Sequence, residues 1–361
     1  MKILENIPIA TLTTMRLGGP ARYVIEVTAP EEIPEAFEFA AEKNLPVWIM
    51  GGGANTIGHD EGFDGVIILN RLHGIEILGE DKTQEMLLRG MGGEVWDDFV
   101  QFSAEQNYSG IEAMAAIPGT LGAAPVQNIG AYGQEIAEVL DSVEVYDAKE
   151  KKFKTLKPSD LQMGYRKSIF NQPENKGRYF IVAVTVRLKK GQLKPPFYTS
   201  LQRYVDEHQE TDFSPKNIAR MVTAVRKAKL PDPKQEASSG SFFKNVYLSD
   251  AEAAEAQAKG IEVWQKGATK NEENDASEDG DGGKTDEEKS ENVINSGWLI
   301  ENAGLKGKTF HGMRVSDKAA LVLINDSAKS YADLAKARAE IRKIVHDKYG
   351  YELAQEPVEI E

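Results

Sequence analysis

An arginine in the stretch "GYRKSIF" is the first side chain whose type and setting could do chemistry. Arg166 follows Tyr165 at a point where the preceding segment is rich in β-forming residues. Such an arginine is either an exposed turn residue or a fixed cation in a cleft. In the second case its planar fork would hold an anion through two parallel hydrogen bonds.

Two more polar residues, far apart in the sequence, have open interpretations. Ser241 lies in "GSFFKN", which has no GxSxG elbow and no obvious base beside it, so a hydrolase nucleophile is poorly supported. It could instead donate a proton, or simply begin a strand after a turn. Glu356, in "LAQEPVEIE", is either an exposed tail acid or a catalytic group.

Two glycine-rich stretches could bind phosphate. "MGGGANT" (50–56) follows a short apolar run, and "IPGTLGAAPVQNIGAYG" (117–133) combines glycines, prolines and small residues that no regular element tolerates well. Glycine lets backbone N–H groups approach a phosphate closely. Neither stretch matches GxGxxG or the Walker motif. The alternatives are a tight turn for the first stretch and a structural Ω-loop for the second.

These residues need a frame of strands and helices. Residues 1–70 predict a strand–helix–strand–loop–strand module, and residues 71–190 predict mainly strands, with a hairpin turning at Asp147–Lys151. Helices are predicted at 30–44, 94–107, 133–140, 214–230, 249–260, 296–303 and 331–350, and a later strand at 319–325. This mixture of helices and strands predicts the fold class α+β.

Composition limits the possible classes. A chain of 361 residues with 41% hydrophobic residues predicts two or three globular domains, and no apolar run is long enough to span a bilayer. The N-terminus does not read as a signal peptide. The chain has no cysteine, and its five histidines show no paired spacing, so we expect no metal site and a reducing, cytoplasmic setting.

The acidic charge is concentrated in one tract. Residues 271–292 carry ten acidic residues and two lysines, and without them the net charge of −14 falls to −6. Neither value favours nucleic acid binding. We predict that 266–292 is a disordered surface insert whose deletion lowers kcat by less than about tenfold.

Taken together, the motifs resemble the UDP-N-acetylenolpyruvoylglucosamine reductase family. The collinear stretches are "TTMRLGGPARY", "GGGANT", "GIEAMAAIPGTLGAAPVQNIGAYGQEI", "GYRKSIF", "AKLPDP", "GSFFKN", "SGWLIENAGLKG" and "ALVLIN", which cover nearly the whole chain. The stretch "PPFYTSLQRYV" resembles the loop of the subclass in which a tyrosine, here Tyr198, folds over the bound nucleotide.

The resemblance implies a two-part FAD-binding region of the PCMH/MurB type and a C-terminal α+β substrate-binding domain. We expect residues 1–71, with the tail 357–361, and residues 72–230 to hold FAD, and residues 231–356 to bind substrate. The implied enzyme is UDP-N-acetylmuramate dehydrogenase, a monomer that uses non-covalent FAD and NADPH to reduce UDP-GlcNAc-enolpyruvate for peptidoglycan synthesis. It would bind neither nucleic acid nor membrane.

The resemblance also assigns site residues. The catalytic residues would be Arg166, Ser241 and Glu356, and the substrate-binding residues would be Tyr165, Tyr198, Lys229, Gly240 and Asn245. The cofactor-binding residues would be Gly51, Gly52, Gly53, Ala54, Asn55, Thr56, Ile117, Pro118, Gly119, Gly122, Ala123, Ala124, Asn128, Gly130, Ala131, Tyr132 and Ile181.

Two positions depart from the family pattern. Ala319 stands where a polar side chain is common, and Pro357 follows Glu356 where the family has a proline before the glutamate. The rival interpretations are another enzyme of the same FAD-binding superfamily and a non-catalytic flavin- or nucleotide-binding module. Covalent flavin is disfavoured because the chain has no cysteine and neither glycine-rich loop contains a histidine.

Overall fold

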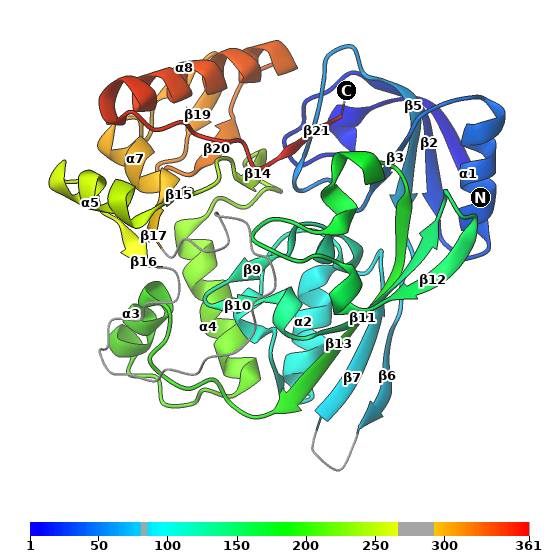
Figure 1. The fold of residues 1–361 in the computed structure, drawn as a ribbon, viewed down its shortest axis with the longest axis horizontal. Helices are drawn as coiled ribbons and strands as arrows, with labels where there is room; N and C mark the ends of the chain where they lie inside the picture. The colour runs from blue at the N-terminus through cyan, green and yellow to red at the C-terminus, as the bar shows by residue number, and fades with distance from the viewer. Residues whose placement is uncertain (81–84, 266–291, 361) are drawn as a thin grey trace. The chain divides into compact units, whose positions relative to one another are not determined.

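The computed structural model describes residues 1–80, 85–265 and 292–360. The chain divides into two compact units (Figure 1), which are described separately below. Unit 1 comprises Met1–Ala228 and Glu359–Glu361, and unit 2 comprises Lys229–Val358. The predicted further division of unit 1 at residue 71 stays a prediction.

Unit 1 begins with a four-stranded sheet whose order is β1-β2-β5-β3. Three of its strands are parallel and β1 is antiparallel to β2. The elements are β1 (Lys2–Pro8), β2 (Pro20–Val27), α1 (Glu32–Glu42), β3 (Val47–Met50) and β5 (Phe63–Asn70). The predicted strands and helix of this module are confirmed. Helix α1 buries its small and branched side chains against the sheet, as an amphipathic crossover helix does.

A second sheet of unit 1 has the order β12-β11-β13-β7-β6, with β8 pairing to β13. Its strands are β6 (Ile75–Glu80), β7 (Glu85–Met91), β8 (Tyr108–Ser109), β11 (Leu140–Asp147), β12 (Lys152–Leu156) and β13 (Tyr179–Lys190). The predicted hairpin is confirmed, because β11 and β12 pair antiparallel around residues 147–152. Strands β9 (Gly130–Ala131) and β10 (Gln134–Glu135) form a small separate hairpin.

The helix predicted at 133–140 is wrong. This stretch forms β10, one 3₁₀ turn (Ile136–Glu138) and the start of β11. The reason is tertiary: from Leu140 onward, pairing with β13 buries alternate valines, and the helical spacing of a few residues cannot compete with that burial.

Two apolar layers hold unit 1 together. Between the sheets, Ile25 and Val66 of the first meet Phe180 and Val182 of the second. On its other side the second sheet is covered by helices α2 (Trp96–Glu105), α3 (Thr199–His208) and α4 (Pro215–Lys229), which form the largest buried cluster with it. The sequence predicted α2 and α4 but not α3.

Unit 2 contains two small antiparallel sheets with helices beside them. The first has the order β14-β20-β19-β18 and the second β15-β17-β16. The strands are β14 (Ser238–Ser241), β15 (Val246–Leu248), β16 (Trp264–Gln265), β17 (Asn292–Ile294), β18 (Thr309–Phe310), β19 (Met313–Val315) and β20 (Val322–Asn325). The helices are α5 (Asp250–Ala258), α7 (Ser296–Asn302) and α8 (Tyr331–Tyr349), and α7 packs against α8 (Figure 1). The predicted helices and strand of this part are confirmed.

The chain returns to unit 1 at its last described residues. Strand β21 (Val358–Ile360) pairs with β4 (Thr56–Gly58), and the carbonyl of Ile360 accepts a hydrogen bond of 3.3 Å from the amide of His59. The Ile360 side chain is fully buried in the apolar cluster of the first sheet.

Candidate functional site

The loop at 51–55 packs so tightly at Gly51 and Gly53 that a side chain would not fit at either position. A Cβ on Gly51 would lie 2.0 Å from Oγ1 of Thr120, and one on Gly53 would lie 2.1 Å from the carbonyl oxygen of Leu12. Gly53 also has φ +63°, in the left-handed region that favours glycine. The glycines therefore let two other segments, around Leu12 and Thr120, reach the loop backbone.

Each of those segments brings a hydroxyl that is buried but makes no hydrogen bond. Thr13 is 6% exposed and Thr120 is 7% exposed, and Oγ1 of each lacks a partner. A buried hydroxyl without a partner costs about 1–3 kcal/mol, so a ligand acceptor at this loop would relieve that cost. Thr13 was not among the predicted site residues, although it begins the quoted stretch "TTMRLGGPARY".

The second glycine-rich stretch is joined to the first. It contains consecutive 3₁₀ turns, Leu121–Ala123 and Pro125–Gln127, and the second turn ends at Asn128, whose φ is +44°. The side-chain amide of Asn55 donates to Oε1 of Gln127 at 2.9 Å. The structure thus brings together two stretches that are more than 60 residues apart.

Arg166 lies against this second stretch. It occupies a tight turn closed by hydrogen bonds between Gly164 and Lys167, with φ +52°. Its Nη1 donates to the carbonyl of Asn128 at 3.4 Å, and its guanidinium carbon lies 5.3 Å from the centre of the Tyr165 ring. Arg166 is half-buried. The exposed-turn interpretation is therefore disfavoured.

The turn that carries Arg166 is fixed to the same stretch at two further points. The hydroxyl of Ser168 donates to the carbonyl of Val126 at 2.6 Å, and the side-chain amide of Asn128 donates to the carbonyl of Gly164 at 3.2 Å. The turn that carries the guanidinium is thus fixed by several hydrogen bonds, which suits the binding of an anion in one geometry.

A tyrosine pair lies at the far end of the stretch, and a half-buried arginine contacts the residue just before its start. The rings of Tyr132 and Tyr198 meet edge to face at 5.7 Å, although Tyr198 is 51% exposed. Burial lowers the pKa of the nearby Arg226 guanidinium, whose Nε donates to the carbonyl of Ala116 at 3.3 Å, and burial raises the pKa of Tyr132. Arg226 was not singled out from the sequence because helices commonly carry exposed arginines.

Ile181 has a different setting from the other predicted cofactor residues. It is 4% exposed within strand β13, and its carbonyl accepts a 2.7 Å hydrogen bond from the side-chain amide of Asn70. Its assignment to cofactor binding stays a prediction.

In unit 2 the structure brings Ser241 and Glu356 onto neighbouring segments. Ser241 ends β14, opposite Val322, and the next residues pair with the tail. The amide of Glu356 donates to the carbonyl of Phe242 at 2.9 Å, and the amide of Lys244 donates to the carbonyl of Ala354 at 2.8 Å. Residues that are 115 positions apart are therefore adjacent through backbone pairing.

The other predicted residues of unit 2 lie near chain turns. Gly240 has φ +68° with open space where a Cβ would be, and Lys229 is the last residue of α4. Oδ1 of Asn245 accepts a 3.2 Å hydrogen bond from the amide of Ser296, which fixes it at the start of α7. Arg166 belongs to unit 1, and Ser241 and Glu356 belong to unit 2.

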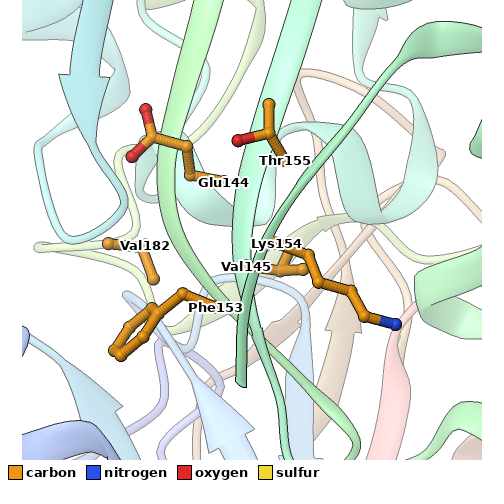
Figure 2. Close-up of a pocket in the computed structure, with 6 residues that line it drawn as sticks. All are labelled: Glu144, Val145, Phe153, Lys154, Thr155 and Val182. Atoms are coloured by element: carbon orange, nitrogen blue, oxygen red, sulfur yellow. The ribbon is translucent and has the colours of Figure 1, made fainter. Parts of the chain in front are cut away.

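A hollow of about 180 Å³ in unit 1 is not this site. It lies over strands β11 to β13 and is lined by Glu144, Val145, Phe153, Lys154, Thr155 and Val182 (Figure 2). Its charged residues already have partners: Arg89 pairs with Glu144 at 2.6 Å, and Lys154 with Asp147 at 3.0 Å. No predicted site residue lines it.

Within the described ranges, no three His, Asp or Glu side chains form a cluster that could hold a metal ion. Among those same residues, no helix is both long and apolar enough to cross a membrane.

Comparison with known proteins decides the family. Residues 21–155 match the FAD binding domain family, and residues 232–360 match the family described as UDP-N-acetylenolpyruvoylglucosamine reductase, C-terminal domain. A UDP-N-acetylenolpyruvoylglucosamine reductase of Burkholderia multivorans is 33% identical over 99% of this chain and 97% of its own length. The chain belongs to the UDP-N-acetylenolpyruvoylglucosamine reductase family. This confirms the resemblance found in the motifs.

Other relatives agree. A reductase of the same name from Bdellovibrio bacteriovorus is 32% identical, covering 99% of each chain. The crystal structure of the reductase from Thermus caldophilus matches over 100% of both chains, with a TM-score of 0.62 at 22% identity, and so shares the fold. The predicted fold class, α+β with an FAD-binding region and a C-terminal domain, is confirmed, as is assignment to the oxidoreductases. The tyrosine-loop subclass stays a prediction.

Proposed function

We propose that this protein is an NADPH-dependent FAD enzyme that reduces UDP-N-acetylglucosamine enolpyruvate to UDP-N-acetylmuramate, a peptidoglycan precursor. The observation that carries the proposal is full-length similarity to reductases named for this substrate. We further propose that it acts as a monomer in the cytoplasm.

The loops of unit 1 have the features that a dinucleotide needs. The glycines at 51 and 53 leave no room for side chains, and the buried hydroxyls of Thr13 and Thr120 lack acceptors. These observations fit non-covalent FAD, held by residues 51–56 and by the stretch 117–132. When bound, FAD would take a hydride from NADPH and supply it to the substrate.

The chemistry of the substrate sets what the protein must add. An enolpyruvyl ether is an electron-rich alkene conjugated to a carboxylate. Hydride can add to its terminal carbon only if the developing negative charge moves onto the carboxylate as an enolate. The neighbouring carbon then takes a proton. The enzyme therefore needs a group that holds the charge and a group that donates the proton.

Arg166 is suited to hold the charge. Its guanidinium is always protonated and can bind a carboxylate through two hydrogen bonds. The tight turn and the contact with the Asn128 carbonyl restrict where the guanidinium can go. Tyr165, beside it, would contact the substrate.

Ser241 is the candidate proton donor and Glu356 the candidate second stabiliser. A neutral hydroxyl is a weak acid, but an enolate beside a desolvated hydroxyl is a strong base. Backbone pairing keeps the segments of Ser241 and Glu356 together. Tyr198, Lys229, Gly240 and Asn245 would complete the substrate contacts.

The test separates the two half-reactions. The purified protein is reduced anaerobically with NADPH, and UDP-N-acetylglucosamine enolpyruvate is then added while flavin absorbance near 450 nm, roughly the free-flavin value, is followed. Bleaching followed by recovery supports cofactor, reductant and substrate together. Bleaching without recovery would reject the substrate, and a protein that FAD cannot reconstitute would reject the flavoenzyme.

A further inference from the structure

The side-chain amide of Gln355 has both ends occupied. Its oxygen accepts a hydrogen bond from Nη1 of Arg338, and its nitrogen donates to the carbonyl of Pro357 at 2.8 Å. The second bond joins the residue before Glu356 to the residue after it. The amide therefore closes a small ring of chain around Glu356.

Arg338 is itself held in place on helix α8. Its Nη2 donates to the Tyr331 hydroxyl at 3.3 Å, and its guanidinium carbon lies 5.9 Å from the centre of that ring. Tyr331 is the first residue of the helix. Tyr331 lies about two helical turns before Arg338. Its contact with the guanidinium restrains the direction in which Nη1 reaches Gln355.

The backbone on the other side of the tail is equally restrained. Gln355 forms a bridge with Phe243, and the amide of Glu356 donates to Phe242. Phe242 and Phe243 are at most 3% exposed, and Pro357 is buried. The tail is thus fixed in two ways. Its backbone pairs with Phe242 and Phe243, and the Gln355 side chain accepts a hydrogen bond from Arg338.

We propose that Arg338 and Gln355 are positioning residues that orient Glu356 for the reaction. This inference rests on the proposed function, in which Glu356 stabilises the developing charge. The Glu356 carboxyl group extends from its backbone, so a displacement of the backbone would displace the carboxyl group from the reacting atoms. The hydrogen bonds from Gln355 to Pro357 and from Arg338 to Gln355 restrain this backbone, and in this proposal neither side chain contacts the substrate.

The test compares Arg338→Met and Gln355→Met with the unchanged protein in both half-reactions. We expect reoxidation of the reduced flavin by substrate to slow about 10- to 100-fold, as a displacement near 1 Å of a catalytic group does. Flavin reduction by NADPH and FAD content should not change. Arg342→Met is the matched control, because Arg342 lies on the same helix and pairs with exposed Glu352 at 3.4 Å; its reoxidation rate should stay normal.

Glu356→Gln and the double variant Arg338→Met/Glu356→Gln complete the design. If Arg338 acts through Glu356, the double variant is no slower than Glu356→Gln alone. Arg338→Lys, which keeps one donor toward Gln355, should recover part of the rate. Additive losses, or normal reoxidation in Gln355→Met while Glu356→Gln is slow, would overturn the positioning role alone. Normal reoxidation in Glu356→Gln would overturn the proposed role of Glu356 and this inference with it.

Discussion

At the residue scale, Arg166 combines the side chain proposed to hold the developing charge with a strained backbone. Its φ of +52° lies in the left-handed region, which costs a residue with a Cβ about 1–2 kcal/mol. The surrounding hydrogen bonds, from Ser168 to Val126 and from Asn128 to Gly164, hold it there. Strain maintained by its surroundings is common at functional sites.

Replacing Arg166 should therefore separate stability from activity. We expect Arg166→Gly to be about 1 kcal/mol more stable than Arg166→Ala, because glycine adopts positive φ without a steric cost. Both variants should lose substrate-driven flavin reoxidation by about 100-fold or more. Urea unfolding and stopped-flow absorbance measure the two effects. Arg187→Ala, at an arginine that is 43% exposed, is the control and should behave normally in both. Near-normal turnover of Arg166→Ala would contradict the assignment.

The unpartnered hydroxyls of Thr13 and Thr120 make a second prediction. Thr13→Val and Thr120→Val should each weaken FAD binding about fivefold, since each would remove one hydrogen bond that we propose to FAD. The FAD-free variants should be more stable than the FAD-free parent, because a methyl group replaces a hydroxyl that has no partner. Titration with FAD and thermal unfolding with and without it measure both quantities.

The control for the threonine pair is Thr223→Val. The Thr223 hydroxyl donates to the Ala219 carbonyl at 2.7 Å within helix α4, so FAD affinity should not change. Lower stability of the FAD-free Thr13 and Thr120 variants would show that these hydroxyls stabilise the protein without the cofactor.

The sequence predicted only part of the site. Glycine and proline limit the backbone by themselves, so the loops at 50–56 and 117–133 could be recognised from residue types alone. Thr13, Arg226 and Gln355 could not, since each acquires its contacts from a segment distant in sequence. Gln355, for example, meets a helix residue 17 positions earlier. Such pairings depend on packing that residue types do not encode locally.

At the element scale, the β11–β12 hairpin is stabilised by a buried carboxylate. The Asp147 side chain is fully buried, and it accepts hydrogen bonds from Arg178 at 3.0 and 2.9 Å and from Lys154 at 3.0 Å. The amides of Lys149 and Glu150 also donate to it. Arg178 above all lowers the pKa of Asp147 well below its usual range. The turn thus depends on an ionised aspartate.

This arrangement makes stability depend on pH. The lowered pKa in the folded state means that the contribution of Asp147 is full above its unfolded-state pKa of about 4 and is lost as pH falls through the folded-state value. Asp147→Asn should lower the free energy of unfolding by about 3 kcal/mol at pH 7. The difference in this free energy between the variant and the unchanged protein should become smaller toward pH 3. Urea unfolding at several pH values measures it.

Asp141→Asn, on the same strand, is the matched control. Asp141 pairs with Arg187 at 2.6 Å but is partly exposed, so its loss should cost less than about 1 kcal/mol. Equal costs at the two positions would contradict the dependence of the hairpin on buried charge.

Elements were predicted best where length and burial acted together. Helices α1, α2, α4 and α8 have apolar residues at helical spacing over ten or more residues, and all four were recognised. The stretch 133–140 was too short for its helical spacing to outweigh pairing with β13. Helix α3 was missed because only Leu201 and Val205 are buried on it, which leaves a weak pattern.

At the scale of the whole molecule, unit 1 is completed by residues from the far end of the chain. Ile360 is fully buried in the cluster formed by the first sheet, and Glu359 pairs with His59 at 3.1 Å. We expect Ile360→Ala to destabilise unit 1 by about 3 kcal/mol through the cavity it leaves. The temperature at which the protein releases FAD, followed by flavin fluorescence, should fall accordingly.

Val358→Ala is the matched control, two residues earlier, because Val358 is 47% exposed. Its effect should stay within about 0.5 kcal/mol. If Ile360→Ala released FAD at the same temperature as Val358→Ala, the strand would not contribute to the stability of unit 1.

The return of the chain at Ile360 also affects folding during biosynthesis. A ribosome makes residues 1–228 first, yet the apolar cluster of the first sheet lacks Ile360 until all of unit 2 has been made. At roughly 5–20 residues per second, the 130 residues of unit 2 take about 7 to 26 s to synthesise. During that interval the apolar side chains that pack against Ile360 are exposed, and β4 lacks its partner strand β21. A nascent chain stalled before residue 359 should accordingly bind chaperones more strongly than one released after it.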